Sequence, residues 1–141
     1  MSPSISIFSS CYQEIISLLK ENQPIEVVGL VFGLWEPQNH VNVTDFQPML
    51  NIDESPTRFS IDYEIFYQHI IKYEKEGREL VGIFHSHPEN AQLAPSQQDI
   101  HYMKYWPYPY TWLIGGDGPD PELKAFALRM GKVIELPIRV I

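Results

Sequence analysis

One stretch decides the architecture of this chain: Val27-Val28-Gly29-Leu30-Val31-Phe32-Gly33-Leu34-Trp35. It is almost continuously apolar and rich in β-branched residues, as is typical of a strand that is buried on both faces. Gly29 and Gly33 interrupt the run, and a glycine inside a strand marks a bend or the close approach of another backbone. The stretch therefore predicts a buried strand around which the other elements are arranged.

Further helices and strands are predicted on both sides of this strand. Hydrophobic spacing, caps and turn residues predict three helices, at residues 9–22, 60–76 and 96–104. Five more strands are predicted at residues 40–46, 79–84, 110–114, 123–129 and 133–138, and residues 47–60 are predicted to be a loop. The fold class that follows is α/β (α+β): one domain, residues 1–141, with helices packed on a mixed central sheet.

The composition argues against several classes of protein. The chain has 141 residues, of which 44% are hydrophobic and 20% charged, an ordinary balance for a globular domain. The 10 basic and 18 acidic residues give a formal net charge of −8, which disfavours binding to nucleic acid or to anionic membranes. No apolar run approaches the ~20 residues that span a bilayer. Because residues 1–16 hold no Lys or Arg, no signal peptide is expected, and we expect a cytoplasmic protein.

The single cysteine and three of the five histidines are expected to be structural. Cys11 has no second cysteine with which to form an internal disulfide, and one cysteine cannot build a Cys-rich zinc or iron–sulfur site. It is expected to be a packed thiol in the first helix. His40, His69 and His101 have no partner at the spacing of metal ligands.

The remaining two histidines stand in the stretch Phe84-His85-Ser86-His87-Pro88. Residues two apart on a strand project to the same face, so both imidazoles would emerge together where the buried strand ends. Open sheets place their binding crevices at such strand ends. Neutral imidazole is a common zinc ligand, which predicts a metal site. The alternative is a pair of ordinary surface histidines.

Two residues at the start of the third helix and one glutamate complete the candidate site. Ser96 and Asp99 are three residues apart and therefore lie on neighbouring positions of one helix face. Asp99 can supply the carboxylate of a zinc site with two histidines and an open position for water. The competing interpretation is a helix cap, with Ser96 at the N-cap and Asp99 reaching back to its amide. Glu26, at the mouth of the buried strand, is the candidate general base, or else a solvated glutamate at a strand end.

These residues together resemble the JAMM (MPN+) family of metalloproteases. The run Pro24-Ile25-Glu26-Val27-Val28-Gly29 and the following residues to Gly33, then His85-Ser86-His87-Pro88, Ser96 and Asp99, match its motif in order. Residues 51–62 also look like the family's loop between the second strand and the second helix. The loop between His87 and Ser96 is one residue longer than in the family pattern.

The resemblance implies a cytidine-deaminase-like JAMM/MPN fold and a set of roles. His85, His87 and Asp99 would bind Zn²⁺, Glu26 would act as general acid and base on the zinc-activated water, and Ser96 would stabilise the oxyanion. All five motif positions are filled, which argues against the metal-free scaffold proteins of the same fold.

The resemblance also implies a substrate. Relatives cleave amide or isopeptide bonds at the C-terminal tail of ubiquitin-like proteins, and small stand-alone prokaryotic members resemble proteases that act on sulfur-carrier proteins. Two other functions stay open: a catalytically silent protein-binding module, and a zinc hydrolase of a small amide or amino-acid conjugate. Residues 51–59 and 89–94 are the expected walls of the groove for a substrate tail. The sequence does not fix the oligomeric state and leaves a homodimer open.

Overall fold

The computed structural model describes residues 4–21, 26–37, 40–51, 62–87, 93–105, 111–116 and 121–141. The helices are α1 (Ser9–Glu21), α2 (Tyr63–Lys75) and α3 (Gln97–Tyr105). The strands are β1 (Ser4–Ile7), β2 (Val28–Glu36), β3 (His40–Met49), β4 (Glu79–His87), β5 (Thr111–Gly116), β6 (Leu123–Arg129), β7 (Lys132–Leu136) and β8 (Ile138–Val140).

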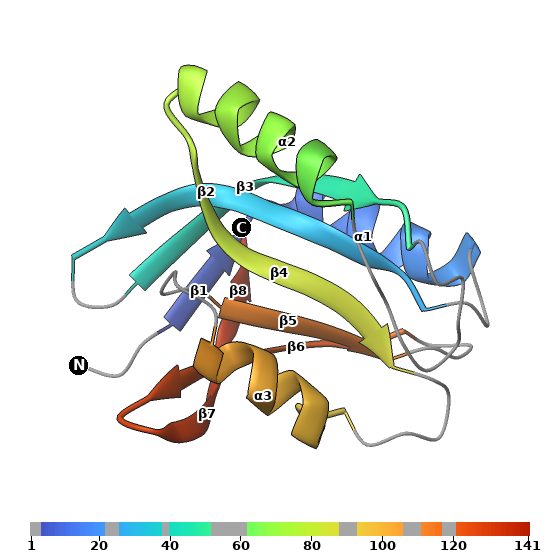
Figure 1. Cartoon of the computed structure of the whole chain (residues 1–141), viewed down its shortest axis with the longest axis vertical. Helices are drawn as coiled ribbons and strands as arrows, with labels where there is room; N and C mark the ends of the chain where they lie inside the picture. Colours follow the sequence, from blue (N-terminus) through green and yellow to red (C-terminus); the bar gives the residue numbers. More distant parts are fainter. Residues whose placement is uncertain are drawn as a thin grey trace.

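The described strands form one mixed sheet in the order β7-β6-β5-β4-β2-β3-β1-β8 (Figure 1). β4 and β2 lie near the middle and are antiparallel, whereas β4 and β5 are parallel. β1 pairs in parallel with both β3 and β8, so the two ends of the chain lie side by side at one edge of the sheet. The predicted class, a mixed central sheet with flanking helices, is confirmed.

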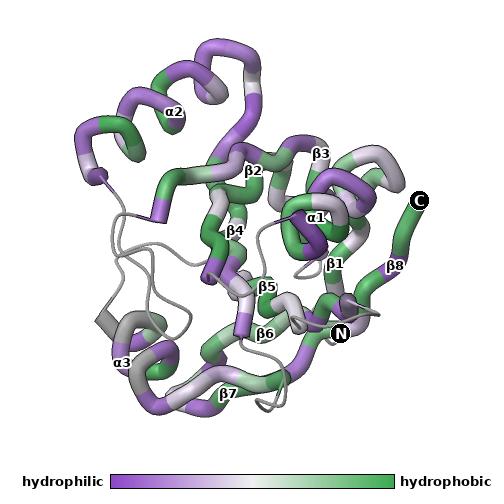
Figure 2. Tube along the Cα trace, turned by 90° about the vertical axis from the view of Figure 1, so that its right-hand side faces the viewer, coloured by the Kyte–Doolittle hydropathy of each residue, from purple (hydrophilic) through white to green (hydrophobic). Residues whose placement is uncertain are grey.

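The helices cover opposite faces of the sheet. α1 lies on one side of β4 and β2, while α2 and α3 lie on the other side (Figure 2). Cys11, Ile15 and Leu19 of α1 belong to a buried cluster with side chains of most of the strands. Phe66 of α2 and Met103 of α3 belong to a second cluster on the opposite face. The central strands are therefore apolar on both faces, as the β2 sequence predicts.

Gly29 and Gly33 are sites of close approach, which confirms the interpretation of the two glycines. A Cβ atom on Gly29 would collide with the ring of Phe46, and one on Gly33 would collide with the backbone oxygen of Asn42. The pairing of β2 with β3 also shifts its register between Phe32 and Gly33. These contacts leave no room for a side chain at either position.

The structure corrects the sequence prediction at both ends of the chain. No strand was predicted at β1, because four residues give too short an alternation to stand out. The predicted strand 133–138 is two strands, β7 and β8, on opposite edges of the sheet. Pro137 separates them because it lacks the N–H that a continuous ladder requires, and its carbonyl oxygen accepts a hydrogen bond from the Ile5 amide at 3.1 Å.

Three strands extend by more than one residue past their predicted ends, among them β5, which continues through Gly115 and Gly116. Gln47–Met49 continue β3 where a loop was predicted, although Pro48 lies among them. β1 pairs only with the first residues of β3, from His40 to Val43, so Pro48 lies where β1 does not reach. β4 continues past Phe84 through both histidines to His87, and β5 pairs with it over that length. The polar residues of the motif are thus part of the strand.

Other sequence-based expectations are confirmed. Cys11 is buried, as a packed thiol should be. His40 is structural: its two ring nitrogens lie 2.7 Å from the Ser4 hydroxyl and 2.9 Å from the Ser6 hydroxyl, which ties β3 to β1. Among the described residues, no helix has the length and hydropathy to cross a membrane.

Candidate metal centre

β4 presents its two histidines on the face of the sheet that α3 covers. Ile83 belongs to the cluster on that face, so strand alternation places His85 and His87 on it as well. The rings of Trp112 and His85 pack in a T-shaped arrangement, with their centroids 6.0 Å apart. The centroids of the two imidazoles are 5.0 Å apart. The prediction that the H-x-H pair shares one face is confirmed.

Glu26 and Asp99 reach the histidines from two other elements. Glu26 lies two residues before Val28, a member of the same cluster, so it faces the same side of the sheet as His85. Asp99 is in the first turn of α3, which begins close to the end of β4 (Figure 1). The exposed fractions of Glu26, His85, His87 and Asp99 are 5%, 1%, 9% and 4%. All four side chains are therefore largely removed from water.

The Asp99 carboxylate lies between the two imidazoles. Its Oδ1 atom is 3.0 Å from Nε2 of His85, and its Oδ2 atom is 3.1 Å from Nε2 of His87. Nδ1 of His85, on the other side of that ring, lies 3.1 Å from Oε1 of Glu26 and 3.3 Å from the Ser86 carbonyl oxygen. The structure thus brings together the three predicted ligands and the predicted base.

Ser96 and Asp99 form the helix cap that was the alternative interpretation of their spacing. The Ser96 amide donates to Oδ2 of Asp99 at 2.9 Å, and the Asp99 amide donates to the Ser96 hydroxyl at 3.1 Å. The first helical hydrogen bond runs from the Ile100 amide to the Ser96 carbonyl. The capping and ligand roles of Asp99 are compatible, because both carboxylate oxygens remain directed at the histidines. The Ser96 hydroxyl accepts a hydrogen bond and keeps its own proton to donate.

The close contacts shift the pKa values of two of these groups. Burial lowers the pKa of His85, but hydrogen bonds to Asp99 and Glu26 outweigh burial and raise it to about 9. Burial raises the pKa of Asp99, but hydrogen bonds from both histidines and from the Ser96 amide hold it well below its usual range. Without a cation at the site, the Asp99 carboxylate is therefore charged and the neighbouring imidazole of His85 takes up a proton.

The donor set fits a divalent metal ion such as zinc. His85, His87 and Asp99 each offer one ligand atom, and these atoms lie within 4.8 Å of one another. Two imidazoles and one carboxylate form a donor set that leaves a position for water or substrate on tetrahedral zinc. The contact of His85 Nδ1 with Glu26 and with the Ser86 carbonyl leaves Nε2 directed at Asp99, and zinc-binding histidines are commonly oriented in this way.

Two residues outside the predicted catalytic and metal-binding set, Ser86 and Asn51 of the predicted groove wall, hold the backbone at Glu26. Nδ2 of Asn51 donates to the Glu26 carbonyl oxygen at 2.8 Å, and the Val27 amide donates to the Ser86 hydroxyl at 2.9 Å. Strand alternation could have identified Ser86, because it points away from the two histidines on either side. No sequence signal places Asn51 beside Glu26, since they are 25 residues apart and meet through the sheet.

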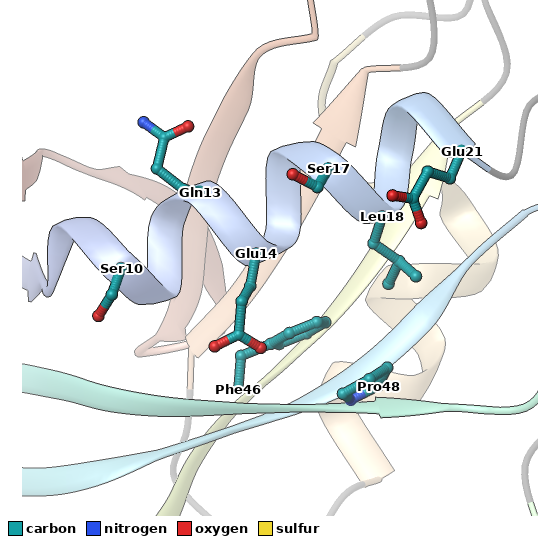
Figure 3. A pocket seen from close by; sticks show the side chains of 8 residues that line it. All are labelled: Ser10, Gln13, Glu14, Ser17, Leu18, Glu21, Phe46 and Pro48. Atoms are coloured by element: carbon teal, nitrogen blue, oxygen red, sulfur yellow. The ribbon is translucent and has the colours of Figure 1, made fainter.

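A separate groove lies between α1 and β3 (Figure 3). Its volume is about 340 Å³, and Glu14, Leu18 and Phe46 are among the residues that line it. It lies on the α1 face of the sheet, and none of the predicted site residues lines it. The predicted walls of the substrate groove, residues 51–59 and 89–94, fall almost entirely outside the described residues, as does most of the longer loop between His87 and Ser96.

Comparison with known protein families identifies the family of this chain. The family model described as prokaryotic homologs of the JAB domain matches residues 8–129, a span that contains all five motif positions. The chain belongs to this prokaryotic JAB family. The resemblance to the JAMM family drawn from the sequence is thereby confirmed.

Two relatives of this JAB protein bear the names of enzymes. A desampylase from Pyrococcus furiosus is 33% identical over 138 residues, which cover 97% of this chain and 91% of the relative. A probable TtuB-protein conjugate cleaving protease from Thermus thermophilus is 34% identical over 122 residues, covering 86% of this chain and 73% of the relative. These relatives confirm that the chain is an enzyme of the JAMM type.

Solved structures share the JAB fold. A solution structure of a protein from Desulfitobacterium hafniense has a TM-score of 0.81 at 26% identity, covering 97% of this chain and 92% of that one. A solution structure of a protein from Salinibacter ruber has a TM-score of 0.69 at 23% identity, covering 96% and 91%. The architecture described above is therefore that of known proteins.

Proposed function

We propose that this protein is a zinc-dependent peptidase that hydrolyses the amide or isopeptide bond at the C-terminal tail of a ubiquitin-like or sulfur-carrier protein. The observation that carries the proposal is the buried grouping of His85, His87 and Asp99 with Glu26 in contact with His85. The family assignment and the conjugate-cleaving relatives support the substrate class. We also propose a cytoplasmic location and a single domain spanning residues 1–141.

His85, His87 and Asp99 would hold the ion. Zinc in such a site supplies Lewis-acid activation of the attacking water and of the scissile carbonyl. Asp99 is already fixed for this role by the Ser96 amide, and its position in the first turn of α3 favours the charged carboxylate.

Glu26 would move the proton during hydrolysis. Its carboxylate takes a proton from the attacking water as the water oxygen bonds to the carbonyl carbon. When the C–N bond breaks, the same carboxyl group gives the proton to the departing amine. The products are the carrier with a free C-terminal carboxylate and the released amine, so the hydrolysis needs only water as co-reactant.

Ser96 would stabilise the negative charge that develops on the carbonyl oxygen. Its side chain is exposed at the start of α3, and its hydroxyl proton is not needed for the cap, in which the hydroxyl oxygen accepts. An oxyanion-hole donor typically contributes about 10²–10³ in rate. Capping and catalysis can therefore use the same hydroxyl group at once.

The proposal is tested with a carrier of the ubiquitin fold, joined through its C-terminal glycine to a lysine of a second protein. Intact-mass measurement should show the free carrier and the free amine after incubation with the zinc-loaded enzyme. Glu26→Gln should form both products about 10²–10⁴-fold more slowly, whereas Glu14→Gln, a change at an exposed glutamate on α1, should behave as the wild type. A folded, zinc-loaded protein that binds the conjugate without cleaving it would favour the silent binding module. Cleavage only of small amides would favour a zinc hydrolase of a small amide or amino-acid conjugate.

A further inference from the structure

The peptide unit that joins Glu26 to Val27 is held on both sides by buried side chains. Asn51 donates to its carbonyl oxygen, and the Ser86 hydroxyl accepts from its N–H, at 2.8 and 2.9 Å. Both side chains are buried. Two side chains, one from β4 and one from just beyond the end of β3, thus fix one peptide plane at Glu26.

These two hydrogen bonds hold a peptide unit that lies just before the regular strand ladder of β2. β2 begins at Val28, so Glu26 and Val27 precede the regular strand. The Ser86 amide adds a backbone hydrogen bond to the Val27 carbonyl oxygen at 3.0 Å, and the two side-chain bonds complete the set. The carboxylate end of Glu26 is in turn located by Nδ1 of His85. Glu26 is therefore anchored at its backbone and at its carboxylate.

Ser86 also connects the base to the metal ligands. It lies between His85 and His87 on β4, and its hydroxyl points to the opposite face, towards the start of β2. A shift of the Glu26 backbone relative to the two imidazoles would strain the bond between the Ser86 hydroxyl and the Val27 amide. The Ser86 hydroxyl and the Asn51 amide thus help to set the distance between the base and the ligand pair, together with the backbone bond of Ser86 and the His85 ring.

We propose that Ser86 and Asn51 are positioning residues that hold the Glu26 carboxylate in its place beside the metal ligands. This proposal rests on the proposed role of Glu26 as the proton carrier. Neither side chain needs to touch the substrate. A misplacement of about 1 Å in a reacting group can lower a rate by about 10²-fold, so loss of either anchor should lower kcat.

The test uses Ser86→Ala, Ser86→Thr, Asn51→Ala and Asn51→Asp in the full-length zinc-loaded protein. Asn51→Asp keeps the shape of the side chain but turns a carboxylate oxygen towards the Glu26 carbonyl. We expect kcat to fall about ten- to a hundredfold in Ser86→Ala and in both Asn51 variants. KM and zinc content should stay close to the wild-type values, and Ser86→Thr, which retains a hydroxyl, should restore kcat.

Thr111→Val is the matched control. Thr111 is also a buried hydroxyl residue tied to β4, because its Oγ1 atom donates to the Val81 carbonyl oxygen at 3.1 Å. That bond lies at the other end of the strand from the metal ligands. The control should lower the melting temperature as much as Ser86→Ala does, without the same loss of kcat. Equal losses of kcat in both variants would overturn the proposal, as would a loss of zinc that accounts for the lower rate.

Two further measurements separate this proposal from the proposed function. In a Glu26→Gln background, Asn51→Ala should lower the residual rate no further, because the group that Asn51 positions is already gone. Hydrogen exchange should be faster at the Val27 amide in Ser86→Ala than in the wild type, and unchanged there in Thr111→Val. If the wild type hydrolyses the conjugate but the anchor variants keep its full kcat, only the positioning role fails. If the wild type hydrolyses no conjugate, the proposed function fails, and the positioning role fails with it.

Discussion

Nδ1 of His85 lies 3.1 Å from Oε1 of Glu26, although the two residues are 59 positions apart in the chain. The antiparallel pairing of β2 with β4 creates this contact, because it sets Val28 opposite His85 and brings the residues just before β2 alongside. One ring nitrogen of His85 therefore faces the candidate base while the other faces Asp99. The candidate base and the candidate metal ligands are thus linked through a single imidazole.

Replacing the candidate base should separate metal binding from catalysis. Glu26→Gln keeps the size of the side chain and removes its ability to accept a proton from water. We expect zinc content and melting temperature close to wild type and a loss of turnover of about 10²–10⁴-fold. Metal analysis and kinetics on the same preparation check this. A variant that hydrolyses the conjugate near the wild-type rate would remove Glu26 from the mechanism.

Removing a candidate ligand should remove the metal. The wild type, purified without chelators, should contain about one zinc per chain, and His87→Ala should lose it, because one imidazole and one carboxylate hold zinc weakly. Zinc should raise the melting temperature of the wild type and not that of the variant. His69→Ala, a change on α2, is the control and should keep the metal. Equal zinc contents in the two variants would show that the ion binds elsewhere.

Ser96 has a capping role and a proposed catalytic role, and one substitution can measure both. Loss of the cap in Ser96→Ala should lower the free energy of unfolding by about 0.5–2 kcal/mol. Loss of the oxyanion donor should in addition lower kcat by about 10²–10³ with little change in substrate binding. Thermal unfolding and steady-state kinetics report the two effects separately. A lower melting temperature with unchanged kcat would leave only the capping role.

The glycines of β2 should tolerate no side chain. Gly33→Ala would bring its Cβ atom into the backbone of Asn42, which cannot move without disturbing the β2–β3 pairing. We expect the free energy of unfolding to fall by about 1–3 kcal/mol or more, measured by denaturant titration. Gly116→Ala is the control, because its nearest contacts would be at an ordinary 3.6 and 3.8 Å. Equal stability of the two variants would contradict the packing described.

The thiol of Cys11 should be inert in the folded protein. Burial first, and then the charges of Glu14 and Asp45, raise its pKa from 9.0 to about 12. A neutral thiol is thus favoured by folding, and the resulting stability is fully present below pH 9 and is lost as the pH rises towards 12. Alkylation at pH 8 should require unfolding, and Cys11→Ala should flatten the stability profile between pH 9 and 12. Rapid alkylation of the native protein would contradict this.

Local sequence patterns predicted most of the elements, because they depend on side-chain periodicity within one segment. Residues 9–22 and 123–129 became α1 and β6 almost without change. β1 and β8 could not be predicted in the same way. Each has few residues, and each is stabilised by pairing with a strand far away in the chain. The break at Pro137 could not be predicted either, because it depends on β7 and β8 joining opposite edges of the sheet.

The sequence likewise predicted those features of the site that depend on local spacing. The alternation of His85 and His87 and the three-residue step from Ser96 to Asp99 are local, and both were found in the sequence. The positions of Glu26 and Asn51 depend on strand pairing, which periodicity does not specify. Trp112 is a third example, since its contact with His85 arises from the parallel pairing of β4 with β5.

Zinc titration of the stripped enzyme shows whether hydrolysis depends on the metal. The ion is removed with a chelator, the chelator is dialysed away, and hydrolysis of the carrier conjugate is followed as zinc is added back. We expect no turnover in the metal-free protein and full recovery at about one equivalent of zinc per chain, with no recovery in His87→Ala. Turnover at the full rate in the metal-free wild type would contradict this expectation.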